Sequence, residues 1–393
     1  MKKLPIIIGL LFIFNLIIKG LFLNHFPNSL SFQEVEILRF MHINPSINDF
    51  SFRLINVFIG GSIDAILFYL IFKKTKNLLL SLIIAIAVGL SPWFVVLSRY
   101  LNYYLPLILL TVIVLNILPK KLYPILIAAL SLASFRFLVI SHDLSSIRLF
   151  SIIPDLIRVF DFRTLFFQGD PSSPMLRIPL TGFFYYLDIL AFFSGISYLF
   201  LINKNKELKT FVNHILLLGL FLFLILPADL LMTQRGELIF LWISIINGLG
   251  YYNFFDILRR KSIFFIYIFV FIFSVNFLFT AELFINHFDK KNSSEWSYAE
   301  QSTIKYLITK NNEPVYMTNQ SDKLYRYWQF LKEKNMKATE VPIDQMKELC
   351  KNPQNICIAK KEELSFFDIK KDDAKEKFGN FDGLPIYFIL PAR

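Results

Sequence analysis

Two carboxylates stand close together just after the first apolar run of the chain, in residues 31–36 (SFQEVE). A glutamate can accept a proton from a hydroxyl group as a general base. Glu34 and Glu36 are two positions apart, so on a helix they would point about 200° apart and only one could face a given cavity. Two interpretations stay open: a general base, with Glu34 the first candidate and Glu36 the second, or two solvated interfacial carboxylates.

Arginines stand near the ends of several apolar runs and could bind an anion. Arg99 and Arg235 are the principal candidates, and Arg53 and Arg163 are a second pair. A guanidinium group binds phosphate oxygens through parallel hydrogen bonds, which suits it to a phosphate ester. The alternative for each arginine is that its charge reaches toward lipid headgroups from an interfacial position.

The composition places the chain among α-helical integral membrane proteins. Of 393 residues, 55% are hydrophobic and 17% aromatic, more than the core of a soluble domain would hide. An apolar run of about 18 to 24 residues can cross a hydrocarbon layer of about 30 Å as a helix. Such runs predict about nine spans, at residues 4–24, 52–72, 77–91, 101–118, 123–141, 179–202, 210–227, 237–255 and 262–285.

Basic residues predict the orientation of these spans. They gather in alternate loops, at Lys2 and Lys3, Lys73–Lys76, Lys120 and Lys121, Lys204–Lys209, and Arg259–Lys261. The positive-inside rule makes these loops cytoplasmic. The first run lacks a small-residue cleavage site, so we expect it to be retained as a span. The prediction is a multi-pass protein of the plasma membrane, with its N-terminus in the cytoplasm and its C-terminus outside.

Two domains follow from where the apolar runs end. Residues 1–285 form the predicted membrane domain, with long outer loops at 25–51 and 142–178, and long loops commonly carry binding and chemistry. Residues 286–393 predict a small extracytoplasmic α/β domain, with strands or helices near 298–310, 314–318, 322–334, 338–341, 344–351, 356–359 and 386–390. Its Cys350 and Cys357 either form a disulfide or remain two buried thiols.

Ionisable residues also lie within the predicted spans. Asp64, Arg136 and Asp188 are of this kind, and such groups face a cavity or a partner inside the bundle. For Asp64 a structural partner or a packing role is favoured over catalysis.

Several short motifs, taken in order, resemble the GT-C superfamily of membrane glycosyltransferases. The resemblance is to bacterial members related to dolichyl-phosphate-mannose protein mannosyltransferases and aminoarabinose transferases. The motifs are Lys19 at the end of the first span, residues 27–34 (PNSLSFQE), Phe52–Leu54, residues 90–93 (LSPW), Leu97–Arg99, residues 165–171 (LFFQGDP), Gly182 with Asp188, residues 227–235 and residues 288–298. Their shared order, over most of residues 15–330, carries the resemblance.

The resemblance implies an enzyme that moves a hexose or pentose from a polyprenyl-phosphate donor, with inversion, to a hydroxyl of a protein, lipid or glycan at the outer membrane face. The base would come from residues 31–36, the arginines would bind the donor phosphate, and Gln33, Asp49, Asp170 and Asp188 would line the substrate cavity. Where the family has an aspartate this chain has Gln33, and an amide cannot accept a proton at neutral pH. Either Glu34 or Glu36 takes over, or the protein is a catalytically silent relative that binds lipid-linked sugar or acts as a membrane scaffold.

Other classes of protein are disfavoured. The net charge of +11 arises largely from the inner loops and the lysine-rich tail, and no nucleic-acid signature accompanies it. His25, His42 and His142 lack metal-ligand spacing, so we expect no metal and no cofactor; some relatives use a divalent cation, and this sequence specifies none. The chain shows no internal repeat, which argues against a secondary transporter.

Overall fold

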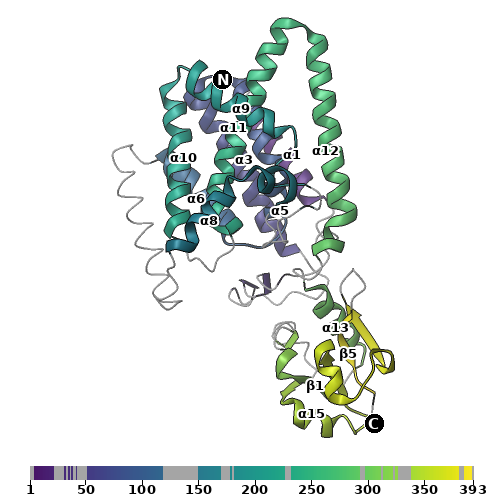
Figure 1. The fold of residues 1–393 in the computed structure, drawn as a ribbon. Helices are drawn as coiled ribbons and strands as arrows, with labels where there is room; N and C mark the ends of the chain where they lie inside the picture. Colours follow the sequence, from purple (N-terminus) through teal and green to yellow (C-terminus); the bar gives the residue numbers. More distant parts are fainter. Residues whose placement is uncertain are drawn as a thin grey trace. The chain divides into compact units, whose positions relative to one another are not determined.

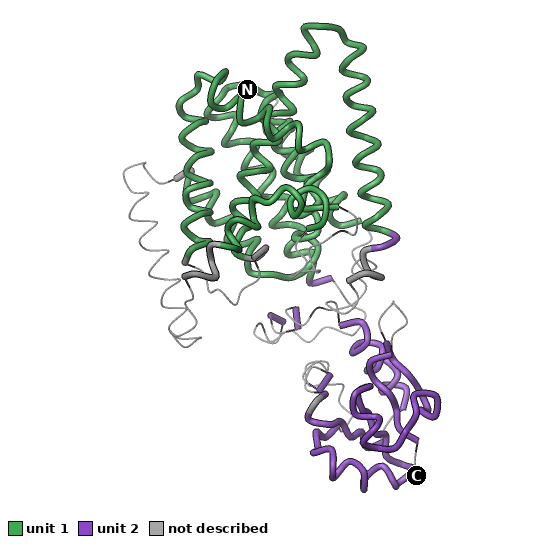
Figure 2. Tube along the Cα trace, viewed as in Figure 1, with its two compact units in different colours: residues 1–21, 53–285 green, residues 22–52, 286–393 purple. Residues whose placement is uncertain are grey.

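A computed structural model of the chain shows helices followed by a small mixed sheet (Figure 1). It describes residues 4–21, 31, 34–35, 37–38, 41, 51–117, 149–169, 178, 181–225, 232–292, 297–310, 313–321, 324–325, 338–379 and 385–391. Two compact units share these residues, 1–21 with 53–285 and 22–52 with 286–393 (Figure 2). We call them the membrane unit and the C-terminal unit. Residues 22–52, which hold the predicted outer loop 25–51, group with the C-terminal unit.

Helices build the membrane unit. They are α1 (Leu4–Gly20), α3 (Leu54–Thr75), α4 (Leu78–Gly89), α5 (Pro92–Leu97), α6 (Tyr104–Ile117), α8 (Leu149–Val159), the π-helical η4 (Arg163–Gln168), α9 (Asp188–Ser197) continued by η6 (Tyr198–Ile202), α10 (Lys206–Ile225), α11 (Met232–Lys261) and α12 (Ile263–Asn292). Local signals set their ends. Lys76 takes a left-handed conformation (φ 54°) after α3, and the Asn77 side chain then accepts a hydrogen bond from the Leu80 N–H at 3.1 Å to begin α4.

Four of these helices are long and apolar enough to cross a membrane within the described residues. They cover Ser51–Thr75, Lys206–Leu224, Arg235–Lys261 and Ile263–His287. Four shorter apolar helices, at Leu4–Gly20, Leu78–Gly89, Tyr104–Leu115 and Asp188–Ile202, also lie where the sequence predicts spans. The predicted span at 123–141 lies outside the described residues. The apolar helices agree with a membrane protein, and the count of about nine spans remains a prediction.

Small residues let α9 and α11 approach closely. A Cβ atom added at Gly195 would collide with the Ile246 backbone, and one added at Gly250 would collide with the Ala191 carbonyl. Ala191 and Gly195 are four positions apart and so share a face of α9, a spacing that lets transmembrane helices pack backbone against backbone. The apolar window of α11 is accordingly 83% buried, whereas that of α12 is only 6% buried. The exposed residues of α12 are mostly aromatic and aliphatic, as expected of a helix facing lipid.

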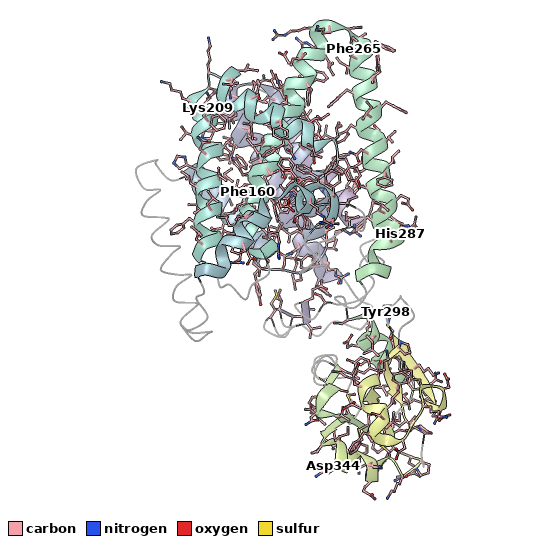
Figure 3. All side chains as sticks on the ribbon, viewed as in Figure 1. Phe160, Lys209, Phe265, His287, Tyr298 and Asp344 are labelled. Carbon is pink, nitrogen blue, oxygen red and sulfur yellow. A yellow bond between two sulfur atoms is a disulfide. The ribbon has the colours of Figure 1, made fainter. Side chains whose placement is uncertain are left out.

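One end of the membrane unit collects the basic residues of those predicted cytoplasmic loops that the structure describes, at Lys73–Lys76, Lys204–Lys209 and Arg259–Lys261. The Asn77 side chain donates to the Tyr252 hydroxyl at 2.8 Å, and the Asn205 side chain donates to the Lys74 carbonyl at 2.9 Å. Lys209 stands at the same end (Figure 3). We call this the lysine end. We call the opposite end, where α1 ends and α3, α6 and α11 begin, the arginine end.

A five-stranded sheet forms the centre of the C-terminal unit. Its strand order is β2-β1-β3-β5-β4, with β1 (Val315–Thr318), β2 (Ala338–Val341) and β3 (Ile356–Lys360) parallel and β4 (Glu376–Gly379) and β5 (Pro385–Ile389) antiparallel. Helices α13 (Tyr298–Ile308) and α15 (Ile343–Leu349) lie where the sequence predicts them. Strand β4 was not predicted from the sequence, because Glu-Lys-Phe-Gly is short, polar and without apolar alternation. The predicted helix 322–334 is described only at residues 324–325, which are helical.

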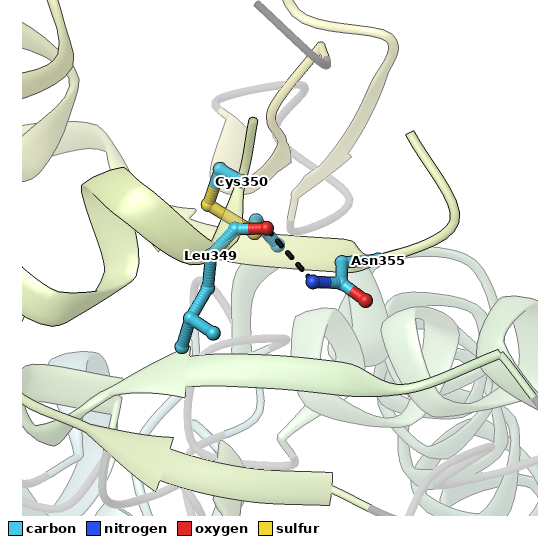
Figure 4. The surroundings of a disulfide bond; sticks show 4 residues. Leu349, Cys350 and Asn355 are labelled. Carbon is cyan, nitrogen blue, oxygen red and sulfur yellow. Dashed lines mark hydrogen bonds between the residues drawn. A yellow bond between two sulfur atoms is a disulfide. The ribbon is translucent and has the colours of Figure 1, made fainter. Parts of the chain in front are cut away.

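The two cysteines form a disulfide, so the structure resolves the alternative that the sequence left open. Cys350 follows α15, Cys357 lies in β3, and their Cα atoms are 5.9 Å apart. The Asn355 side chain donates to the Leu349 carbonyl at 2.8 Å and folds the turn between them (Figure 4). Both cysteines belong to a buried cluster with Met346. The bridge therefore ties α15 to the central strand of the sheet.

Candidate functional site

Arg235 is enclosed near the start of α11, at the arginine end. Its side chain is fully buried, and Nη2 donates to the carboxylate of Asp155 in α8. The guanidinium carbon lies 4.7 Å from the ring centre of Phe223 in α10. Nε and Nη1 have no hydrogen-bond partner among the described residues. Two nitrogens of this guanidinium could therefore donate to a bound anion, the role that the sequence predicts for Arg235.

Glu237 lies two residues further along α11 and was missed by sequence analysis. It is 4% exposed, and its Oε1 has no hydrogen-bond partner in the described part of the chain. An electrostatic interaction couples it to Tyr104, the first residue of α6. Asn102 caps α6 by accepting from the N–H groups of Tyr104 and Leu105 at 3.2 and 3.0 Å, which holds Tyr104 in place. A carboxyl group is therefore held inside the unit, within electrostatic reach of the Tyr104 phenol.

A buried ion pair joins α1 to α3. Lys19 Nζ donates to Asp64 Oδ2 at 2.5 Å, and both side chains are fully buried. The Lys19 ammonium also lies 4.1 Å from the ring centre of Phe94. Asp64 Oδ1 and Asn15 Oδ1 have no partner among the described residues, and a Cβ at Gly89 would lie 2.5 Å from Asn15 Oδ1. Asp64 thus has the structural partner that sequence analysis favoured.

Two further arginines named by the sequence also lie at the arginine end. Arg99 is 3% exposed, and its Nη1 donates to the Lys19 carbonyl at 2.8 Å. Its guanidinium carbon lies 5.3 Å from the ring centre of Phe284 in α12. Arg53 is fully buried where α3 begins. Arg163, in contrast, is exposed in η4, so burial separates it from the other three candidates.

Glu34 is fully buried and forms a capping box. Its Oε2 accepts from the Ser31 N–H at 3.0 Å and the Ser31 hydroxyl at 3.3 Å, while its own N–H donates to Ser31 Oγ at 3.2 Å. The signal was present in the sequence, because Ser-x-x-Glu is the pattern of such a box. Glu34 belongs to the C-terminal unit, and the arginines belong to the membrane unit.

Asp188 holds helices together. Its Oδ2 accepts from the Tyr185 N–H at 3.0 Å and its Oδ1 accepts from the Tyr251 hydroxyl. The Tyr185 hydroxyl donates in turn to the Leu90 carbonyl at 2.6 Å. These bonds tie the start of α9 to α11 and to the end of α4. The remaining candidates, Glu36, Gln33, Asp49 and Asp170, lie outside the described residues, as does Arg136.

The arginine end thus combines buried cations with a carboxyl group, that of Glu237, whose Oε1 has no partner among the described residues. Guanidinium donors in a dry setting can stabilise a phosphate, and a buried carboxylate can exchange a proton. The described residues contain no group of three His, Cys, Asp or Glu side chains that could hold a metal ion.

Comparisons of the chain with protein-family models, with curated proteins and with solved structures each gave no match. The functional assignment therefore depends on the residues of this chain alone.

Proposed function

We propose that the protein is a GT-C-like membrane glycosyltransferase that moves a sugar from a polyprenyl phosphate to an acceptor hydroxyl with inversion. The observation that carries the proposal is Arg235, a fully buried arginine with two nitrogens lacking a partner among the described residues. Burying such donors unpaired is costly, so a ligand that accepts from them would offset the cost. The leaving phosphate of a lipid-linked sugar is a ligand of this chemistry.

An apolar groove supports a lipid-linked donor. It has a volume of about 540 Å³ and runs between α9 and α12. Its walls are largely aromatic and aliphatic, including Leu190, Phe271 and Val275. An isoprenoid chain bound there would bury apolar surface against both helices.

The disulfide and the lysine end support the proposed orientation. Disulfides persist in oxidising compartments, so the Cys350–Cys357 bridge supports an extracytoplasmic C-terminal unit. With about nine spans, the lysine end would face the cytoplasm and the arginine end would face out. A reporter fused after Arg393 should be active only outside the cytoplasm, and a cytoplasmic signal would contradict this orientation.

A catalytically silent relative is the second candidate, and Glu34 favours it. Gln33 stands where the family has an aspartate, and the nearby Glu34 carboxylate already serves the helix cap. Such a protein would bind the lipid-linked sugar at the same buried arginines and release no sugar.

Sugar release by purified protein in nanodiscs tests both candidates. The substrates would be radiolabelled polyprenyl-phosphate hexoses and pentoses, with binding measured in parallel. We expect turnover, reduced about 100-fold or more in Arg235→Ala, because one phosphate-stabilising donor contributes about that factor. Arg260→Ala is the matched control, since Arg260 is 76% exposed at the lysine end. If the wild type binds a donor but releases no sugar, the silent relative is favoured. If it shows no binding and no release, both candidates are refuted.

A further inference from the structure

Glu237 is a buried acid at the arginine end, and its position in α11 does not let it stabilise the start of that helix. It is the sixth residue of α11, which begins at Met232. A carboxylate stabilises a helix start through the first-turn N–H groups, and this effect fades beyond the first turn. Glu34 shows the contrast, because it bonds back to Ser31 and caps its helix. Glu237 therefore does not cap α11.

Among the described residues, no basic side chain is paired with Glu237 either. Arg235 is two positions away, so the two side chains point about 200° apart around the helix, and Arg235 pairs with Asp155 of α8. Tyr104 is coupled to Glu237, yet Oε1 still lacks a partner among the described residues. A carboxyl group buried in this way costs folding free energy when it is ionised. Ionisable groups kept in a membrane bundle at such a cost commonly take part in function.

The place of Glu237 along α11 suits chemistry at the membrane surface. It lies about 7.5 Å along the helix axis from Met232 and about 36 Å from Lys261 at the lysine end, at 1.5 Å per residue. It thus shares the arginine end with Arg53, Arg99 and Arg235, all of them buried. A base for sugar transfer must lie at the same face of the membrane as the groups that hold the phosphate.

We propose that Glu237, rather than Glu34 or Glu36, is the general base of the transfer, an inference that depends on the proposed function. The acceptor hydroxyl gives its proton to the Glu237 carboxylate, and its oxygen bonds to the anomeric carbon. The bond from that carbon to the phosphate oxygen breaks, and the electron pair leaves with the polyprenyl phosphate. Gln33 can then stand where the family has an aspartate, because the base lies on another helix.

The test compares Glu237→Gln, Glu34→Gln and Glu207→Gln in full-length protein in nanodiscs. Glu207, exposed in the first turn of α10, is the matched control for changing a carboxylate to an amide. Sugar release to water from the radiolabelled donors gives the rate, equilibrium binding gives the donor affinity, and thermal unfolding gives stability. We expect Glu237→Gln to lower the rate about 100-fold or more, since a general base contributes about 10² to 10⁴. Its donor affinity should stay within about threefold of wild type.

Stability separates this role from a structural one. Replacing a buried, incompletely paired carboxylate by an isosteric amide should leave the unfolding temperature unchanged or higher. If the Glu237 carboxylate had a structural role, Glu237→Gln would instead lower the unfolding temperature, and the rate would fall in proportion to the fraction of folded protein. If Glu237→Gln keeps more than a tenth of the wild-type rate while Glu34→Gln abolishes it, the base is Glu34 and the inference is wrong. If the wild type itself releases no sugar from any donor, the proposed function fails, and this inference with it.

Discussion

Replacing Asp64 by asparagine should destabilise the membrane unit by about 2 to 4 kcal/mol, because it leaves the Lys19 ammonium buried without its counter-ion. Both side chains are fully buried, and Nζ and Oδ2 are 2.5 Å apart. Removing one partner of a buried pair costs about 3 to 5 kcal/mol. The new amide can donate to the unpaired Asn15 Oδ1, which would return about 1 kcal/mol.

A double-mutant cycle measures the coupling free energy between Lys19 and Asp64. Lys19→Met should cost about 3 to 5 kcal/mol, whereas the double variant, which removes both charges, should cost less than either single change. Reversible unfolding in mixed detergent micelles, followed by circular dichroism, gives the four free energies. Asp256→Asn is the control, because its partner Arg260 is 76% exposed and the pair is worth at most about 1 kcal/mol. Single-variant costs that add to within about 0.5 kcal/mol would show that the two charges are not coupled and would refute the reasoning.

Three further predictions concern packing, the disulfide and alkaline stability. Gly250→Ala should lower the free energy of unfolding by about 1 to 3 kcal/mol, because the added Cβ would push α11 away from Ala191 in α9. Thermal unfolding measures this change, and an unfolding temperature equal to that of the wild type would contradict the close approach. Cys350→Ser should destabilise the C-terminal unit by about 2 to 3 kcal/mol, the value expected for a short closed loop, and non-reducing mass spectrometry should find no free thiol in the wild type. Burial, and then the Glu300 carboxylate that accepts from its hydroxyl at 3.1 Å, raises the pKa of Tyr387 above its usual value of about 10. Because the folded state favours the protonated phenol, this stabilisation is complete below about pH 10 and is lost as the pH rises further; Tyr387→Phe should flatten the fall in unfolding temperature above pH 10, and an unchanged slope would contradict this.

The helices and most strands could be predicted from sequence because their signals are local. A run of apolar residues fixes the length of α3 or α12 without reference to any other part of the chain. The parallel strands β1 and β3 likewise appear as short apolar runs between turn residues. Strand β4 was not predicted, because its polar sequence becomes a strand only by pairing with β5.

The candidate site was only partly predictable. Arg235, Arg99 and Arg53 were named from their residue type and position, and all three are buried at one end of the membrane unit. Their partners could not be named, since Asp155 is 80 positions from Arg235. Glu237 was missed because it is the first residue of the predicted span 237–255, and an acid at the end of a span is expected to reach water unless neighbouring helices bury it.

The sequence by itself determined the membrane class, the helical runs, the clustering of lysines in alternate loops and the pattern Ser-x-x-Glu that makes Glu34 a cap. The tertiary structure decided the pairing of Lys19 with Asp64, the joining of Cys350 to Cys357 and the burial of Glu237. The reason is physical. Hydrophobic length and capping act between residues a few positions apart, whereas burial and ion pairing depend on which distant surfaces exclude water together.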